Sequence, residues 1–298
     1  MRLSVLDTSP IVAGSSARQA LHNTVDLAVL ADELGYQRYW VPEHHGMRGV
    51  ASSAPAVLAG RLADATSRIR VGAGGVLLPN HAPLVVAEQF GTLAALHPGR
   101  IDLGIGRALG GPPRVAEAIR RAEDFPARLA ELIGYFTGEH ALQAVPAIGN
   151  PVGFWLLGSS AGSARLAASL GLAYAFAHHL NPHEAADATR TYREACPRRE
   201  LIVSVSAIVA ETDARAEWLA GPIREKVARR KRGERILLPS PDDVTSTEPV
   251  PGLLVGAPDA VREQLRSIAE ETGADELMIT TPIHDHADRR RSYELLKV

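Results

Sequence analysis

The segment Arg100-Ile101-Asp102-Leu103-Gly104-Ile105-Gly106-Arg107-Ala108-Leu109 decides between two α/β folds. Its first six residues are typical of a buried strand, and Gly-Ile-Gly resembles the start of a dinucleotide-binding turn. Leu109 stands where the third glycine of such a turn would be, and no helical pattern begins there. The residues after the first apolar run, Leu6-Asp7-Thr8-Ser9-Pro10, also lack these glycines. The sequence therefore favours a closed barrel over a Rossmann fold.

Eight strand-then-helix units run along the chain. The predicted strands are the apolar runs 3–6, 38–41, 69–78, 100–105, 154–157, 173–177, 201–209 and 276–281. The predicted helices cover 17–34, 55–65, 83–96, 125–136, 160–170, 182–195, 213–231 and 257–271, and a helical tail covers 285–296. This alternation predicts an α/β fold in which residues 1–298 form a single-domain (β/α)8 TIM barrel.

Composition excludes several classes of protein. The chain is 46% hydrophobic and 22% charged, which is typical of a globular domain. No apolar run approaches the roughly 18 residues of a membrane helix, and the apolar start is too short for a secretory signal. A single cysteine, Cys196, forms no internal disulfide, so we expect a cytoplasmic protein. A net charge of -2 gives no general attraction to nucleic acid or to acidic membranes.

One segment departs from the strand–helix alternation. Residues 233–256 contain four prolines among Ser, Thr and Asp, so we expect a mobile loop near the active end of the barrel. Residues 224–235, just before it, include seven Lys and Arg side chains. These are typical of a solvated helix end, where cations meet the negative end of the helix dipole. The alternative is contact with the anionic tail of a cofactor or substrate.

Polar side chains follow several of the predicted strands, at the end where barrels place their active sites. The segments concerned are 43–45, 79–81, 106–107, 158–163 and 178–179. The turn Gly158-Ser159-Ser160 leads into a helix, so backbone N–H groups and hydroxyls converge there and favour a phosphate. Arg107, after the neighbouring strand, would add a charged fork. The alternative is that the serines only cap the helix.

The cluster Glu43-His44-His45 allows two interpretations. A metal site is disfavoured because adjacent side chains on an extended chain point in opposite directions, and no Cys pair or His-x-His supplies further ligands. A histidine at the active end of a barrel suits proton transfer near neutral pH. Nucleophilic hydrolysis is disfavoured because the chain has no Gly-x-Ser-x-Gly elbow.

Bare backbone at Gly74-Gly75 could support a flat ring. Together with the phosphate turn, this indicates a long, flat, phosphorylated cofactor, and flavin mononucleotide (FMN) fits that description.

Six segments, in order along the chain, carry a resemblance to a known family. They are Tyr39-Trp40-Val41-Pro42-Glu43-His44-His45, residues 71–79, Ala87-Glu88-Gln89-Phe90, residues 98–108, residues 156–160 and residues 272–278. In these segments the chain resembles the luciferase-like flavin monooxygenases, in the single-chain bacterial branch related to alkanal monooxygenase.

The resemblance implies a TIM barrel that uses reduced FMN and O2 to oxygenate a small organic substrate. His44, with His45 beside it, matches the proposed catalytic base. The cofactor-binding residues implied are Glu43, Gly74, Gly75, Arg107, Gly158, Ser159, Ser160 and Ser163. The family has a cis peptide bond where Gly74-Gly75 falls, and relatives are commonly homodimers. Because the chain shows no NAD(P)H fingerprint, we expect a separate flavin reductase to supply FMNH2.

Alternatives remain within this scaffold. Some relatives use the deazaflavin F420, whose phosphorylated tail the basic run could meet. A flavin-binding protein without catalysis, for storage or sensing, is a further possibility. The chain also departs from the family in two places. The loop at 233–256 is shorter than in typical relatives, which would protect the reacting flavin less from water. Ser159 replaces an acid of the luciferase chain, which should ease phosphate binding.

Overall fold

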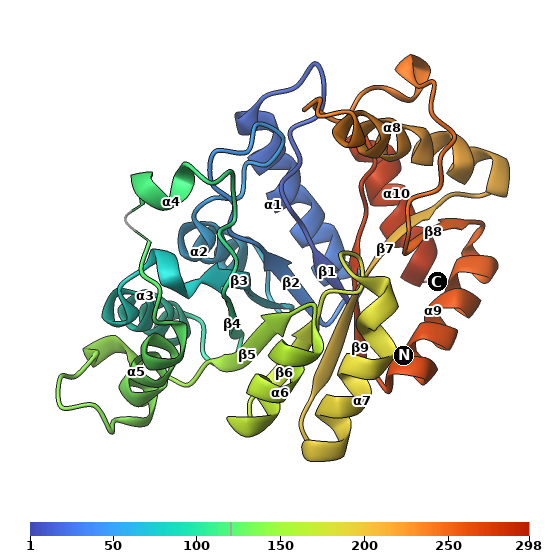
Figure 1. Ribbon diagram of the computed structural model, residues 1–298. Helices are drawn as coiled ribbons and strands as arrows, with labels where there is room; N and C mark the ends of the chain where they lie inside the picture. The colour runs from blue at the N-terminus through green and yellow to red at the C-terminus, as the bar shows by residue number, and fades with distance from the viewer. Residues whose placement is uncertain (120, 298) are drawn as a thin grey trace.

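Strands and helices alternate along residues 1–119 and 121–297, the part of the chain that the computed structural model describes (Figure 1). The strands are β1 (Arg2–Leu6), β2 (Arg38–Val41), β3 (Arg70–Leu77), β4 (Ile101–Gly106), β5 (Gly153–Gly158), β6 (Ala173–Phe176), β7 (Leu201–Val209), β8 (Leu253–Gly256) and β9 (Glu276–Thr280). The helices are α1 (Ala17–Glu33), α2 (Pro55–Ala65), α3 (Pro83–Leu96), α4 (Val115–Ala118), α5 (Phe125–Thr137), α6 (Ala161–Ser169), α7 (Ala185–Ala195), α8 (Asp213–Lys231), α9 (Pro258–Thr272) and α10 (His286–Lys297).

Eight of the strands close into a ring. Strands β1 to β6 neighbour one another in order, β7 pairs with β6, and β9 joins β7 to β1. Every pairing is parallel, as successive strand–helix units require. Figure 1 shows the two chain ends on the same side of the molecule, where β1 meets β9. The predicted single-domain (β/α)8 architecture is confirmed.

Strand β8 is a ninth strand that the sequence did not predict. Its residues fall inside the loop predicted at 233–256. Residues 202–206 of β7 pair with β9 and complete the ring, whereas residues 206–209 extend beyond it and pair with β8. Leu253, Leu254 and Val255 are the apolar residues that form this extra pairing. The composition of 233–256 as a whole, dominated by proline and polar residues, hides this short run at its end. A short 3₁₀ helix, Pro241–Asp243, also lies within the segment.

The interior of the barrel is filled toward the amino ends of its strands. A cluster of buried side chains occupies the centre: Leu6, Trp40, Trp155, Ala175, Ile202 and Met278. Below them, the buried guanidinium of Arg38 binds Asp102 and Glu276, each at 3.0 Å. We therefore expect the polar side chains that contact a ligand to lie at the carboxyl ends of the strands. None of the helices in the described residues combines the length and apolar character that crossing a bilayer requires.

Candidate active site

The predicted residues lie at the carboxyl ends of four neighbouring strands. Glu43, His44 and His45 follow β2, and Gly74-Gly75 lies within β3. Arg107 follows β4, and the serine turn follows β5. Because β2, β3, β4 and β5 are adjacent and parallel, these segments share one end of the barrel. Figure 1 shows α4 and α8, which follow β4 and β7, at this same end.

Glu43 is a buried carboxylate that joins the loops after β2 and β3. One oxygen accepts hydrogen bonds from His45 Nε2 at 2.7 Å and Asn80 Nδ2 at 2.9 Å. The other accepts from His81 Nε2 at 2.8 Å and the Leu77 backbone N–H at 3.0 Å. Burial alone would raise the pKa of Glu43, but the hydrogen bonds from His81, Asn80 and His45 outweigh burial and lower it.

Glu43 holds its neighbours in place, because four donors of the chain itself reach its carboxylate. Its contact with the cofactor stays a prediction. His45 is fixed by the same carboxylate, and its backbone N–H donates to the Gly110 carbonyl at 2.8 Å. Its catalytic role stays a prediction. Asn80 and His81 received no role from the sequence, although their place directly after the strand next to β2 pointed to this contact.

His44 has a different environment from His45. Its Nδ1 atom is buried and has no hydrogen-bond partner among the described residues. Burial, followed by repulsion from His45, lowers the pKa of His44, while Glu43 opposes the shift. An imidazole with a lowered pKa is neutral at pH 7 and can accept a proton. The His44 backbone N–H donates to the Ser52 carbonyl at 2.9 Å, which closes the turn formed by residues 45–51.

A further histidine, His179, lies close to His44 across the end of the barrel. Burial lowers the pKa of His179 to about 4, and repulsion from His178 and His44 adds to this shift. Its Nδ1 atom lies 2.9 Å from the Ser204 hydroxyl, which fixes the ring. The sequence places His179 only after the sixth predicted strand and assigns it no role. No group of three or more His, Cys, Asp or Glu side chains in the described residues is arranged to hold a metal ion.

Gly74 and Gly75 form a place where no side chain fits. The peptide bond between them is cis, as the family resemblance implies. A Cβ at Gly74 would lie 3.0 Å from the Trp40 side chain, and one at Gly75 would lie 2.6 Å from the Gly104 carbonyl oxygen. The pairing register between β3 and β4 also shifts here, between Gly74 and Val76. Both glycines are therefore required by packing within the barrel, where Gly74 is half-buried and Gly75 is buried.

In the turn formed by residues 158–163, some serine side chains cap helix α6 and another has no hydrogen-bond partner in the described part of the chain. Ser160 is the N-cap of α6, and its hydroxyl accepts from the Ser163 N–H. The Ser163 hydroxyl turns inward and lies 2.8 Å from the Tyr174 hydroxyl. Gly158 leaves room for this arrangement, because a Cβ there would lie 2.0 Å from the Ser163 oxygen. The capping alternative thus describes Ser160 and Ser163, whereas the Ser159 hydroxyl has no partner among the described residues.

Arg107 lies exposed at the rim, one strand away from this turn. Its backbone carbonyl accepts a hydrogen bond from Arg121 at 2.9 Å, while its guanidinium bonds to none of the described residues. Together with the Ser159 hydroxyl and the first N–H groups of α6 that Ser160 does not cap, it forms a set of donors without partners among the described residues. Such a set suits a phosphate.

The loop that follows α8 is anchored along its length. Glu225 of α8 accepts hydrogen bonds from the Ser246 N–H at 2.9 Å and from the Thr245 hydroxyl at 3.1 Å. The hydrogen bond from Arg229, with these loop contacts, lowers the pKa of Glu225 to about 2. At its other end, the Leu238 carbonyl accepts from the Ala13 N–H at 2.9 Å. The mobility expected for residues 233–256 stays a prediction.

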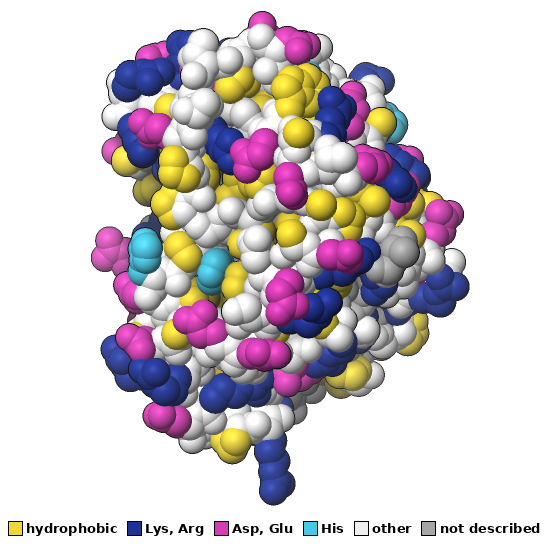
Figure 2. Space-filling view, turned by 90° about the vertical axis from the view of Figure 1, so that its right-hand side faces the viewer, with side chains coloured by type: hydrophobic (Ala, Val, Ile, Leu, Met, Phe, Trp, Pro, Cys, Tyr) yellow, Lys and Arg dark blue, Asp and Glu magenta, His cyan; other side chains and the backbone are white. Residues whose placement is uncertain are grey.

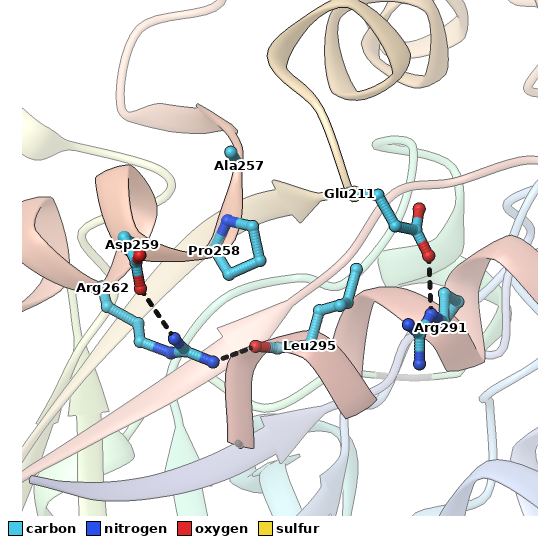
Figure 3. Close-up of a pocket in the computed structure, with 7 residues that line it drawn as sticks. All are labelled: Glu211, Ala257, Pro258, Asp259, Arg262, Arg291 and Leu295. Carbon is cyan, nitrogen blue, oxygen red and sulfur yellow. Dashed lines mark hydrogen bonds and ion pairs between the residues drawn. The ribbon is translucent and has the colours of Figure 1, made fainter.

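A cavity of about 510 Å³ lies elsewhere, between the amino end of α9 and α10 (Figure 3). Its two guanidinium groups are taken up by the chain: Arg291 binds Glu211 at 2.7 Å, and Arg262 binds Asp259 at 3.0 Å. None of the predicted site residues lines it. Figure 2 shows acidic and basic side chains interspersed over this side of the molecule, with histidines near one margin. The residues with unpartnered groups at the carboxyl ends of the strands remain the better candidate site.

Comparison with known proteins assigns the family. The sequence model of the luciferase-like monooxygenases matches residues 1–276. The chain belongs to this family. A luciferase-like monooxygenase of Escherichia coli (strain K12) is 44% identical over 317 residues, which cover 98% of this chain and 95% of the relative. The N-acetyl-S-alkylcysteine monooxygenase of Bacillus subtilis (strain 168) is 34% identical over 326 residues, which cover 99% and 97%.

Solved structures agree with this assignment. The crystal structure of apo-MsnO8 has a TM-score of 0.94 and 42% identity, covering 99% of this chain and 96% of its own. Two more distant structures share the fold of this luciferase-like monooxygenase. One is the oxygenating constituent of 3,6-diketocamphane monooxygenase from Pseudomonas putida in complex with FMN, at a TM-score of 0.75, 21% identity and coverage of 100% and 97%. The other is an F420-dependent secondary alcohol dehydrogenase, at 0.72, 12% and coverage of 99% and 98%. The chain is thus an oxidoreductase of the monooxygenase class.

Proposed function

We propose that this monooxygenase uses reduced FMN and O2 to oxygenate a small organic substrate. A separate reductase delivers the FMNH2, because no nicotinamide-binding fingerprint occurs in the sequence. The observation that carries the proposal is the buried, unpartnered Nδ1 atom of His44 at the same barrel end as bare backbone and free phosphate donors. The FMN complex of the diketocamphane enzyme supports the choice of flavin.

The residues present fit FMN at each of its parts. The Gly74-Gly75 backbone can lie against the flat ring, because neither residue carries a side chain that would stand between the ring and the strand. Ser159, Arg107 and the first N–H groups of α6 can hold the phosphate. Reduced FMN, when bound, supplies the two electrons needed to insert one atom of O2 into a substrate and to reduce the other to water.

The chain contributes proton transfer and positioning. His44, neutral at pH 7, accepts a proton at the edge of the site and returns it later in the cycle. Glu43 fixes His45 and His81 and so holds the loops after β2 and β3 in one arrangement. The loop anchored by Glu225 belongs to the same end of the barrel and excludes water from the reaction. Each of these roles can be tested by a single substitution.

The test separates binding from chemistry. We expect His44→Ala to bind FMN nearly as well as the wild type, because the Ser159 turn and Arg107 are untouched. Product formation from photoreduced FMN, O2 and a panel of thioethers, ketones and aldehydes should fall by about 10²–10⁴, the usual contribution of a general base. Unchanged product formation would remove His44 from the mechanism. Tighter binding of F420 than of FMN would favour the deazaflavin alternative, and peroxide as the only product would favour a flavin-binding protein without oxygenation.

We also propose that the enzyme is a homodimer. Helices α2 and α3 carry exposed apolar side chains, among which Val57 is 75% exposed, Leu96 68% and Val85 45%. Strongly exposed apolar side chains on two adjacent helices support a surface that is covered in the assembled protein. Light scattering should give twice the mass of the chain for the wild type, and Val57→Asp should shift the protein toward the monomer. A monomeric wild type would contradict the proposal.

A further inference from the structure

Lys226 of α8 is a partly buried cation without a partner. No hydrogen bond or ion pair joins its ammonium group to any residue in the described part of the chain, and the charged neighbour that acts on it is another cation, Arg230. Burial, together with repulsion from Arg230, lowers the pKa of Lys226. Arg230 stands one helical turn further on and is exposed, and its guanidinium is equally unpaired among the described residues. Two adjacent unpaired cations favour an anion beside them.

Four of the other five cations of the basic run behave differently. Arg224 binds Glu217 at 2.5 Å, and Lys231 binds Glu248 at 2.7 Å. Arg229 and Arg232 both bind Glu234, at 2.9 and 3.3 Å. These four cations are therefore neutralised within the chain. The solvated-helix interpretation describes these four and also Arg235, which is exposed and unpaired among the described residues. It leaves the half-buried Lys226 unexplained.

The position of Lys226 links it to the active end of the barrel. Its Nζ atom lies 3.5 Å from the point that a Cβ at Gly49 would occupy. Gly49 belongs to the turn of residues 45–51, which begins directly after His44 and is closed by the His44 N–H bond to Ser52. The Leu237 side chain, from the loop after α8, packs against the same point. Lys226 thus lies between the His44 turn and the loop that borders the site.

We propose that Lys226, with Arg230 beside it, binds a carboxylate of the substrate, so that this monooxygenase acts on small organic acids. The inference rests on the proposed function, because it concerns the substrate of that same site. A phosphate of the cofactor has the same charge sign, but the Lys226 ammonium lies against the turn that follows β2, and that turn, unlike the one after β5, begins directly after His44. The anion at Lys226 is therefore assigned to the substrate.

Lysine reactivity tests the proposal without any turnover. The chain contains three lysines, Lys226, Lys231 and Lys297, so each can be followed in one peptide map after limiting acetylation with acetic anhydride. Butanoate, hexanoate and octanoate serve as probes, each compared with its own carboxamide, and inorganic phosphate and FMN form two further arms. Lys231, on the same helix and paired with Glu248, is the matched control.

We expect the carboxylates to slow acetylation of Lys226 severalfold, and their amides to leave it unchanged. Lys231 should be unaffected by either. Absence of protection by every carboxylate, equal protection by acids and amides, or equal protection of Lys231 would overturn the proposal. Protection by phosphate or FMN alone would assign the site to the cofactor and would also overturn it. Binding of FMN to the same protein, measured by flavin fluorescence, shows separately whether the proposed function stands.

Substitutions give a second, independent readout. Lys226→Met should raise the KM for an acidic substrate by about tenfold or more, the usual effect of losing a charge-assisted hydrogen bond. The KM for the matching amide should not change, and Lys226→Arg should restore part of the loss. Lys231→Met should leave both values unchanged. Equal effects of Lys226→Met on the acid and the amide would indicate a structural role only.

Discussion

The pair formed by Glu43 and His81 should couple the loops after β2 and β3 with a measurable energy. The Glu43 carboxylate is 2% exposed, and the hydrogen bond from His81 Nε2 is 2.8 Å long. A buried hydrogen bond to a charged group contributes about 1.5–3 kcal/mol, so we expect a coupling energy of about 2 kcal/mol. Glu43→Gln, His81→Gln and the double variant form the cycle. Urea unfolding at pH 7, followed by fluorescence of the buried Trp40 and Trp155, measures each free energy of unfolding.

A pair in the same protein whose carboxylate is exposed is the control. His97 and Asp64 lie 3.6 Å apart, and the Asp64 side chain is 73% exposed. A cycle on that pair should give less than about 1 kcal/mol, as surface ion pairs usually do. Similar coupling energies for the two pairs, or a value near zero for Glu43 and His81, would refute the positioning role. The flavin affinity of Glu43→Gln should fall as well, because the loops around the site lose their common anchor.

Three further predictions concern neighbouring parts of the site. Gly158→Ala should lower the free energy of unfolding by about 1–3 kcal/mol and shift the melting transition, because its Cβ would displace Ser163; an unchanged transition would contradict this packing. For His179, whose pKa is about 4 against 6.5 when unfolded, protonation favours the unfolded state, so stability is full above pH 6.5 and falls as the pH drops toward 4. Between pH 7 and pH 4, the free energy of unfolding measured with urea should fall by about 3 kcal/mol less in His179→Gln than in the wild type. An equal fall in the two proteins would contradict this role of His179. Glu225→Gln should speed amide hydrogen exchange at Ser246, and equal exchange in both proteins would show that the carboxylate does not anchor the loop.

The fold could be predicted from the sequence because local signals and topology agree. Branched apolar runs such as 201–209 alternate with helical periods, and parallel strands joined by helices have few ways to close. Strand β8 escaped prediction because its four residues pair only with the part of β7 that extends beyond the ring. Nothing in the local composition of Leu253–Gly256 reveals that β7 is long enough to offer this edge.

The site could be predicted only as far as chain position determines it. His44, Gly74 and Arg107 lie at or near the carboxyl ends of predicted strands, so the sequence predicted that they share one end of the barrel. The resemblance added their expected roles. What each side chain contacts depends on how the loops pack, which is why the contact between Glu43 and His81 was not predicted. The same reason separates Lys226 from the other cations of its run, since pairing with acids is decided in three dimensions.

Anaerobic calorimetric titration with FMNH2 and with reduced riboflavin measures whether this end of the barrel holds a flavin by its phosphate. We expect saturable binding of one FMNH2 per chain, with riboflavin weaker by about tenfold or more, because riboflavin lacks the phosphate that Arg107 and the Ser159 turn would hold. Arg107→Met should reduce this difference between the two flavins. No saturable heat with FMNH2, or equal affinity for both flavins in the wild type, would contradict the account.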